Sequence, residues 1–313
     1  MLFNKITVIG IGLIGSSLAR VIKREGLAQR LTVCDQNPLY LQQAMELEIA
    51  DEALSDPVAA VKDADLVVLA TPVGVYGNLT RQISPFLNSG TIITDVGSVK
   101  KYACEEIEKN LNGRKDLIIV PGHPVAGTEK SGPTAGFAEL FALRWCILTP
   151  GRFSTPEAIE KITLMWEAAG MNVDTMSVEH HDKVMAAVSH LPHLIAFSIV
   201  GTIADLEGYE KQEIIKYSAS GFRDFTRIAG SDPTMWRDIL INNKTTVLDL
   251  LQRFVEDLIA LERNIRWNEG QKLFDLFSRT RKIRTEVIEA RQDKPETEKL
   301  MLLKEDIKLD NNK

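Results

Sequence analysis

Cysteine is scarce in this sequence, which contains only three such residues among 313. Cys34, Cys104 and Cys146 are odd in number, lie far apart and have no spacing typical of metal ligands. A small secreted domain held together by disulfides is therefore excluded, because such domains are short and dense in cysteine. We expect three reduced thiols in a cytoplasmic protein.

An excess of basic charge and a long apolar run are also missing. The chain has 37 Lys and Arg residues against 43 Asp and Glu, a formal net charge of −6. This balance disfavours nucleic acid as a partner. No continuous run of about 18 apolar residues occurs, so we expect no contact with a membrane. The apolar stretch 1–15 lacks a basic start and a small-residue cleavage site, so it is not expected to be a signal peptide.

What the first half of the chain contains is a regular alternation of apolar runs and helical patterns. The runs are apolar throughout, as expected for parallel strands that are buried on both faces. The alternation predicts βαβ units, and hence an α/β domain with a doubly wound, Rossmann-like parallel sheet. The expected strands are 6–10, 31–35, 66–70, 91–95, 117–121, 144–149 and 171–176, and the expected helices are 13–24, 38–48, 75–87, 99–110 and 156–169.

The second half shows no strand of comparable strength. We therefore place a domain boundary near Ser177, with an α/β domain at 1–177, an all-helical domain at 178–290 and a charged, frayed tail at 291–313. One amphipathic helix is expected over 184–199, bent or broken at Pro192.

A strict heptad stripe marks another helix of this second domain. Its members are spaced 4, 3, 4, 3 and 4 residues apart, which is typical of helix-on-helix packing. The stripe consists of Val247, Leu251, Phe254, Leu258, Leu261 and Ile265, and it is widened by Leu248, Val255 and Ile259. Two interpretations remain open, a core helix of the domain or a helix packed against a second copy of the chain.

The first motif with a chemical meaning is Gly10-Ile11-Gly12-Leu13-Ile14-Gly15, which follows an expected strand and opens an expected helix. In this context Gly10 allows a tight turn, Gly12 lets a pyrophosphate approach the backbone and Gly15 lets the helix pack against the strand. The N–H groups of Leu13 and Ile14 and the helix dipole then hold phosphates. The motif predicts a dinucleotide cofactor; the alternative is a glycine-rich turn without a ligand.

Asp35 ends the second expected strand, 20 residues after Gly15. A carboxylate there accepts hydrogen bonds from the adenosine ribose hydroxyls and repels a 2′-phosphate, which favours NAD over NADP. The alternative role for Asp35 is to cap the helix that begins at Pro38, and one carboxylate could serve both purposes.

Three further strand ends carry polar residues at the edge where open α/β sheets bind ligands. Thr71 follows the third strand, Ser98 the fourth and His123 the fifth. We expect Thr71 to contact the cofactor. A histidine held by the following Pro124 suits a general base, because neutral imidazole with a pKa near ~6.5 accepts a proton at cellular pH.

The helical domain holds two more motifs. His190 and His193 are spaced as two metal ligands could be, but no nearby Cys, Asp or Glu completes a site, so we expect no metal. The pair 180–181 is interpreted as a solvated helix start. The segment Gly221-Phe222-Arg223-Asp224-Phe225-Thr226-Arg227 is either a capping turn with surface ion pairs or an arginine fork for an anionic substrate.

Taken together, these segments resemble the prephenate/arogenate (cyclohexadienyl) dehydrogenases of tyrosine biosynthesis. The shared stretches, in chain order, are VIGIGLIGSSLA, DVGSVK, GHPVAGTEKSG, SHLPH and GFRDFTRIAGSDPTMW. The first is common to many dehydrogenases, whereas the third and the last are much more specific. The resemblance implies a small-molecule substrate, NAD as cofactor, and a homodimer formed through the helical domain.

The resemblance also implies residue roles. His123 matches the histidine that takes the proton from the C4 hydroxyl of the substrate ring, and Ser98 matches a serine beside that hydroxyl. His190 matches a histidine of the substrate pocket. Arg223 matches the arginine that binds the substrate carboxylate, and Arg227 is expected to be a surface or structural residue.

Thr128 and Glu129 fall where the family lines the mouth of the pocket. The implied reaction transfers a hydride to NAD and releases CO₂, giving 4-hydroxyphenylpyruvate from prephenate or tyrosine from arogenate. Both substrates stay open, as does inhibition by tyrosine. Two rival classes remain: a β-hydroxyacid dehydrogenase, which would normally carry a catalytic lysine in the helical domain, and a non-enzymatic nucleotide sensor, which needs neither His123 nor Arg223.

Overall fold

The computed structural model describes residues 1–313 except 129, 206–212, 214–215, 218 and 290–313. The chain forms two compact units, Met1–Val247 and Leu248–Lys313. The division falls inside a long helix and therefore does not test the domain boundary expected near Ser177, which stays a prediction. The expected tail at 291–313 lies outside the described residues.

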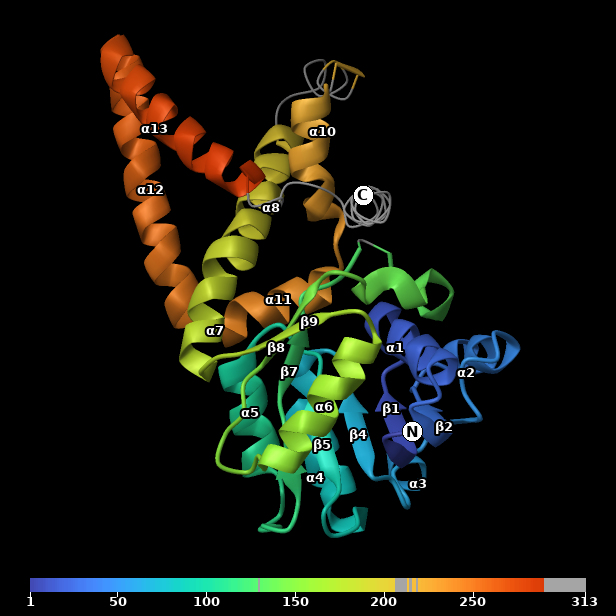
Figure 1. Ribbon diagram of the computed structural model, residues 1–313. Coiled ribbons are helices and arrows are strands. Elements are labelled where there is room, and N and C mark those ends of the chain that lie inside the picture. The colour runs from blue at the N-terminus through green and yellow to red at the C-terminus, as the bar shows by residue number, and fades with distance from the viewer. Residues whose placement is uncertain (129, 206–212, 214–215, 218, 290–313) are drawn as a thin grey trace, which may run out of the picture. The chain divides into compact units, whose positions relative to one another are not determined.

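Unit 1 is built around a six-stranded, all-parallel sheet with strand order β3-β2-β1-β4-β5-β6, as predicted for the α/β domain (Figure 1). The order reverses at β1, which is the switch point of a doubly wound sheet. The strands are β1 (Phe3–Ile9), β2 (Ala28–Cys34), β3 (Glu52–Leu54), β4 (Leu66–Leu69), β5 (Ile92–Asp95) and β6 (Ile118–Ile119). The short β3 has no apolar run, which is why its sequence did not predict it.

Helices cover both faces of this sheet. Alternate strand residues enter two separate cores: Val8 and Val68 belong to one, Ile9 and Leu69 to the other. This alternation explains why the strands are apolar throughout. The helices are α1 (Leu13–Arg24), α2 (Pro38–Glu46), α3 (Pro57–Ala60), α4 (Tyr76–Ile83), α5 (Lys100–Lys109) and α6 (Pro156–Ala168).

A second, three-stranded sheet contains β7 (Gly122–Pro124), β8 (Trp145–Leu148) and β9 (Asn172–Thr175). The strands expected at 144–149 and 171–176 therefore do not extend the parallel sheet. β7 runs antiparallel to β8, which pairs in parallel with β9. The chain leaves β6 before Pro121, which has no N–H to donate to the first sheet, and Gly122 opens the new strand.

A continuous helical stretch follows Ser177. It contains α7 (Val178–Met185), a π-helical turn (Ala186–His190) and α8 (Leu191–Ala204). Pro192 cannot donate an N–H and would clash with the carbonyl four residues earlier, so the widened turn before it replaces the expected break. Two shorter helices of unit 1 are α10 (Ser220–Thr226) and α11 (Pro233–Asn242).

The stretch Val178–Ala204 is long and apolar enough, by length and composition, to cross a membrane. The absence of a continuous apolar run was therefore not sufficient to exclude a membrane-spanning helix. The core helix of a soluble protein passes the same test. His181, Asp182 and His190 are buried within this stretch, which shows that its first half packs inside unit 1.

The long helix α12 (Lys244–Arg266) leads to α13 (Gly270–Glu289) through a turn in which Asn268 has a φ of 54°. The heptad stripe lies on α12. Val247 is buried, but Leu258 is 46% exposed and Ile265 is 64% exposed. Leu251, Phe254 and Leu261 are half-buried, so both interpretations of the stripe stay open and packing against a second copy stays a prediction.

Candidate functional site

The glycine loop between β1 and α1 has the geometry that the motif predicted. Gly10 has a φ of +96°, and a Cβ there would lie 2.5 Å from the carbonyl oxygen of Ala70. A Cβ on Gly15 would lie 1.9 Å from the carbonyl oxygen of Gly10. Neither position accepts a side chain. Gly12 instead faces open space, with nothing within 4 Å of its Cβ position, so a ligand has room to approach the backbone.

The N-terminus of α1 fits an anion. Gly12 caps it without a side-chain hydrogen bond, and its first turn holds no acidic residue. The first N–H groups, including those of Leu13 and Ile14, have no acceptor within the helix and lie at the positive end of its dipole. The Thr71 hydroxyl, just beyond β4, is buried without a hydrogen-bond partner among the described residues. Phosphate and sugar oxygens of a dinucleotide match these groups.

Asp35 follows β2 and braces the glycine loop. Its carboxylate accepts the N–H of Ile11 at 2.9 Å and the N–H of Asn37 at 2.9 Å. Helix α2 is capped by the side chain of Asn37, which accepts the N–H of Leu39. The alternative that Asp35 serves as the helix cap is therefore wrong. A carboxylate has about four acceptor positions, so Asp35 keeps room for further donors.

His123 lies on β7 and is buried against a second histidine that sequence reasoning misjudged. Its Nδ1 is 2.8 Å from Nε2 of His181, whose own Nδ1 is 2.8 Å from Oδ1 of Asp182. His180 is exposed, but His181 is fully buried, so the interpretation of the pair as a solvated helix start is wrong for His181. Helical periodicity carried the signal, because His181 is one turn before the buried Met185.

A fully buried ion pair supports the strand that carries His123. Lys100 Nζ is 2.5 Å from Oδ2 of Asp95 and donates to the carbonyl oxygen of Gly122 at 2.6 Å. The Asp95 carboxylate also accepts the N–H groups of Gly97 and Gly122. The pair thus ties the end of β5 to the start of β7. Both residues belong to the DVGSVK segment, of which only Ser98 was predicted to matter.

The electrostatics of this cluster keep His123 neutral. Burial lowers the pKa of His123 well below its ordinary value, and the nearby His181, Lys100 and His190 lower it further. Burial also lowers the pKa of His181, although Asp182 opposes this effect. At neutral pH, His123 is therefore an uncharged imidazole, which is the form able to accept a proton.

His190 and Trp236 form a second wall beside this cluster. The two rings meet edge to face with centroids 6.2 Å apart, and His193 stacks on Trp236 at 3.7 Å. Burial lowers the pKa of His190 to about 4, and the backbone of Ser98 lies beside its ring. His190 Nδ1 lies 3.2 Å from Nδ2 of Asn243, and the backbone of Ser98 hydrogen-bonds to the His190 ring. Trp236 Nε1 is buried without a hydrogen-bond partner among the described residues, and buried groups of this kind are normally satisfied, so it fits a polar ligand.

The structure thus brings together His123, His190 and the backbone of Ser98, but it does not place Arg223 with them. Arg223 is exposed on α10, with its Nε 3.5 Å from Oδ1 of Asp224. The guanidinium of Arg227 lies close enough to His193 to help lower its pKa, after the larger effect of burial. Both arginines are exposed, and Arg227 is the one whose charge acts on His193.

The predicted mouth of the pocket is only partly described. Thr128 is exposed and lines a cavity of about 730 Å³ with Lys130, Ser131, Thr134, Ala135 and Phe137. Glu129 lies outside the described residues. The role of both residues stays a prediction.

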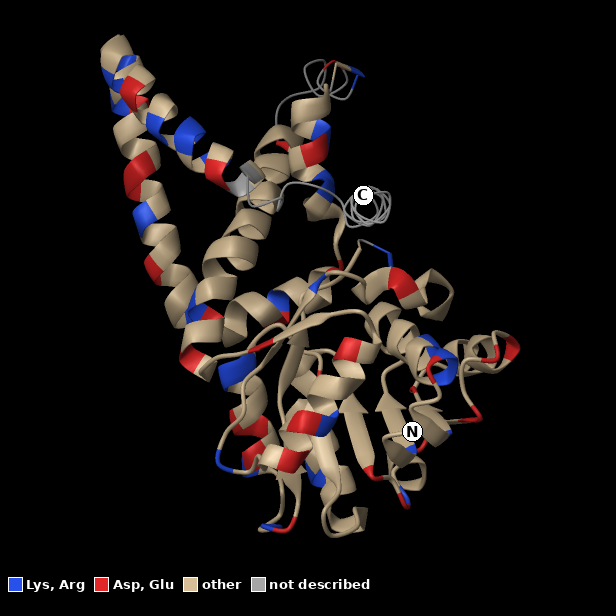
Figure 2. Ribbon diagram, in the orientation of Figure 1, with Lys and Arg blue, Asp and Glu red and all other residues tan. Residues whose placement is uncertain are grey.

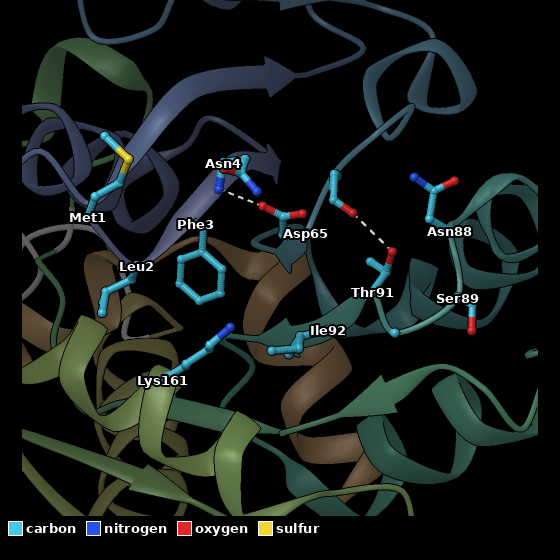
Figure 3. A pocket seen from close by; sticks show the side chains of 12 residues that line it. Met1, Leu2, Phe3, Asn4, Asp65, Asn88, Ser89, Thr91, Ile92 and Lys161 are labelled. Atoms are coloured by element: carbon cyan, nitrogen blue, oxygen red, sulfur yellow. Dashed lines mark hydrogen bonds between the residues drawn. The ribbon is translucent and has the colours of Figure 1, made fainter.

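Another cavity, of about 330 Å³, lies at the opposite edge of the sheet, where β1 and β5 begin (Figure 3). Its wall includes Asp65, which accepts the N–H groups of Asn4 at 2.5 Å and Lys5 at 3.2 Å. Ligands of doubly wound sheets bind beyond the carboxyl ends of the strands. This cavity is therefore not the candidate site.

Comparisons with known proteins agree with this geometry. The family model described as the nucleotide-binding domain of prephenate dehydrogenase matches residues 18–175. The model described as its dimerization domain matches residues 177–279. The cyclohexadienyl dehydrogenase of Zymomonas mobilis is 40% identical over 282 residues, covering 90% of this chain and 95% of the relative. The prephenate dehydrogenase of Bacillus subtilis is 32% identical, covering 88% and 73%.

A solved structure is similar over almost the whole fold. Prephenate dehydrogenase from Aquifex aeolicus, in complex with hydroxyphenyl propionate and NAD+, superposes with a TM-score of 0.83 at 35% identity. The match covers 91% of this chain and 98% of that one. The two family models together cover most of the sequence, and the relatives match nearly end to end, so the chain belongs to the prephenate dehydrogenase family.

Proposed function

We propose that this chain catalyses the oxidative decarboxylation of prephenate or arogenate, with NAD as the oxidant. The observation that carries the proposal is the buried, neutral His123 at the ligand-binding edge of the sheet, within a chain of this family. The Aquifex aeolicus relative was crystallised with NAD+ and hydroxyphenyl propionate, and that compound carries the hydroxyphenyl ring expected of the product.

The cofactor fits the first site described above. We assign the phosphates to the loop of Gly10, Gly12 and Gly15 and to the N–H groups of Leu13 and Ile14. The remaining acceptor positions of Asp35 would accept the ribose hydroxyls, and its charge would disfavour the extra phosphate of NADP. The unpartnered hydroxyl of Thr71 supplies a further contact. A nicotinamide bound there would supply the oxidant that C4 of the substrate ring needs.

The protein's own part in the chemistry is to move one proton and hold the ring in place. His123 takes the proton of the C4 hydroxyl, so the ring oxygen becomes a ketone as C4 is oxidised. The electrons of the bond to the departing CO₂ then enter the ring, and the oxygen takes a proton back to give the phenol. We assign the orientation of that hydroxyl to Ser98 and His190, since the Ser98 backbone lies beside the buried His190 ring and the charge of His190 acts on His123. Aromatisation supplies the driving force.

Arg227 is the better candidate for binding a substrate carboxylate, because its charge acts on His193, whose ring stacks on Trp236. A guanidinium offers paired donors and keeps its charge. We expect Arg227→Gln to raise the KM for the substrate about 10- to 150-fold with a smaller change in kcat, since a hydrogen bond to a charged group contributes ~1.5–3 kcal/mol.

Arg223→Gln is the matched comparison, and steady-state kinetics on both variants decide between the two arginines. Arg223→Gln is expected to change KM less than about threefold, because Arg223 faces Asp224 and, unlike Arg227, is not among the groups that lower the pKa of His193. The opposite ranking would restore the assignment of Arg223 made from sequence. NAD affinity should hold in both variants.

We further propose that the chain is a homodimer formed through its helical domain. That region matches a dimerization domain, and the heptad stripe on α12 includes the exposed Leu258 and Ile265. Helix α8 carries no charged side chain along its length (Figure 2), and Val188 just before it is 64% exposed. Apolar surface of this extent is typical of a protein interface. Sedimentation equilibrium should give twice the 34.9 kDa of one chain, and Leu258→Glu should lower that mass.

The cytoplasm is the compartment we propose. All three cysteines are free, and burial raises the pKa of the Cys34 thiol to about 12. Unbonded cysteines fit a reducing environment.

The proposed activity is tested by following NADH absorbance with prephenate, arogenate and a simple 2-hydroxy acid. Turnover of prephenate or arogenate, with release of CO₂, is the expected result. Turnover of the 2-hydroxy acid alone would indicate the β-hydroxyacid class instead. NAD binding without turnover of any substrate would indicate a nucleotide sensor.

A further inference from the structure

His123, His181 and Asp182 form a chain of hydrogen bonds, and the donors and acceptors in this chain are set by Asp182 at its end. Asp182 accepts the N–H of Lys100 at 2.7 Å and the N–H of Lys101 at 3.0 Å. Burial raises the pKa of Asp182, but the hydrogen bonds from His181 and from these two amides outweigh it and lower the pKa overall. Asp182 is therefore ionised, and an ionised carboxylate only accepts hydrogen bonds.

Asp182 determines which nitrogen carries the proton, first in His181 and then in His123. Because Asp182 only accepts, the proton between it and His181 sits on Nδ1 of His181. A neutral imidazole carries one proton, so Nε2 of His181 has a free lone pair. That lone pair faces Nδ1 of His123 at 2.8 Å. Nδ1 of His123 must therefore carry a proton, which leaves Nε2 of His123 unprotonated.

We propose that His181 and Asp182 are positioning residues that hold His123 in the tautomer protonated on Nδ1, so that Nε2 accepts the substrate proton. The proposal rests on the proposed function. When Nε2 takes that proton, His123 becomes a cation that still donates through Nδ1 to His181. The ring keeps its orientation through proton transfer, since neither hydrogen bond has to break.

The surroundings hold this chain rigid. The side chain of Asn243 donates to the backbone carbonyl of Asp182 at 2.9 Å. The charge of Lys100, which is paired with Asp95, lowers the pKa of both imidazoles. The positive charge of Lys100 disfavours a second positive charge on His181. His181 therefore stays neutral at neutral pH, and each hydrogen bond of the chain keeps its donor and its acceptor.

The tautomer is measured directly by NMR on full-length protein labelled with ¹⁵N-histidine and saturated with NAD. The chain has five histidines, so single substitutions assign each ring. His181→Phe keeps a ring of similar size but removes the acceptor. His181→Gln keeps an acceptor oxygen without a ring. His180→Gln, at the exposed neighbouring position, is the matched control.

We expect His123 to be protonated on Nδ1 in the unmodified protein, in His181→Gln and in His180→Gln. In His181→Phe we expect a mixture of both tautomers. The kcat should fall about 10- to 100-fold in His181→Phe with KM nearly unchanged, and it should stay within about threefold of the parent in His181→Gln. Rescue by glutamine would distinguish control of the tautomer from simple packing.

Protonation of His123 on Nε2 in the unmodified protein would overturn the proposal, as would an unchanged tautomer in His181→Phe. Equal losses of kcat in the Phe and Gln variants would also overturn it, because packing alone would then explain His181. If His181→Phe does not fold, the unmodified protein and His181→Gln still report the tautomer. The NMR result needs no turnover, so absence of activity toward prephenate and arogenate would count against the proposed function alone.

Discussion

Replacing His123 with asparagine is expected to lower kcat by a factor on the order of 10²–10⁴, with little change in NAD affinity. Asparagine keeps a polar side chain but cannot accept the proton of the C4 hydroxyl. His123 lies on β7, whose backbone pairs with β8, so the substitution leaves the strand in place. The glycine loop lies on a different strand connection, which is why cofactor binding should persist.

Steady-state kinetics and a separate titration with NAD check this expectation. His180→Asn is the matched control, because His180 is exposed one residue from the partner of His123. A His123→Asn variant that kept more than half of the parental kcat would remove His123 from the proposed chemistry.

The pH profile gives an independent view of the same residue. A base must be unprotonated, so kcat/KM should rise with pH through the pKa of His123 and then level off. From the sequence alone, the acidic limb of the pH profile would be expected near ~6.5, the ordinary pKa of histidine. Burial and the neighbouring His181, Lys100 and His190 lower that pKa well below its ordinary value. The acidic limb is therefore expected below the ordinary histidine value, and activity should be flat around neutral pH.

The parts of the fold that were predictable from sequence depend on local signals. A glycine loop between an apolar strand and a helix is contiguous in the chain, and so is a histidine before a proline at a strand end. The separate sheet was not predictable, because β8 is as apolar as the strands of the main sheet. An apolar run reports burial but not which strand it pairs with.

The missed site residues were missed because their partners are distant in the chain. His181 meets His123 across 58 positions, and Asp182 meets the N–H of Lys100 across 82. Taken alone, two histidines near a helix start look solvated, and nothing near Lys100 in the sequence marks it as buried. Only the packing of α7 against α5 gives these polar residues their buried partners.

The buried pair of Lys100 and Asp95 leads to the largest expected effect on stability. Lys100→Met keeps the length of the side chain but leaves the carboxylate of Asp95 buried without its cation. Removing one partner of a buried pair costs about 3–5 kcal/mol of unfolding free energy, because the remaining charge is not compensated. Chemical denaturation of the parent and the variant measures this difference.

Two further variants test whether the unpaired carboxylate of Asp95 causes the loss of stability. Lys101→Met changes the exposed neighbour and should alter the unfolding free energy by less than about 0.5 kcal/mol. Combining Lys100→Met with Asp95→Asn removes both charges and should recover part of the loss, although the one oxygen of asparagine cannot replace both acceptors of Gly97 and Gly122. Equal stability of the single and double variants would mean that the buried carboxylate is not what destabilises Lys100→Met.

The same substitution should also act on His123, which connects the stability of the pair to the chemistry. Lys100 lowers the pKa of His123 by its charge and holds the carbonyl of Gly122, the residue before it. Without that charge, the pKa of His123 rises, so in the folded fraction of Lys100→Met the acidic limb of kcat/KM should move to higher pH. If the acidic limb stays at the same pH while stability falls as expected, Lys100 has only a structural role. The neutral state of His123 would then be due to burial and not to the charge of Lys100.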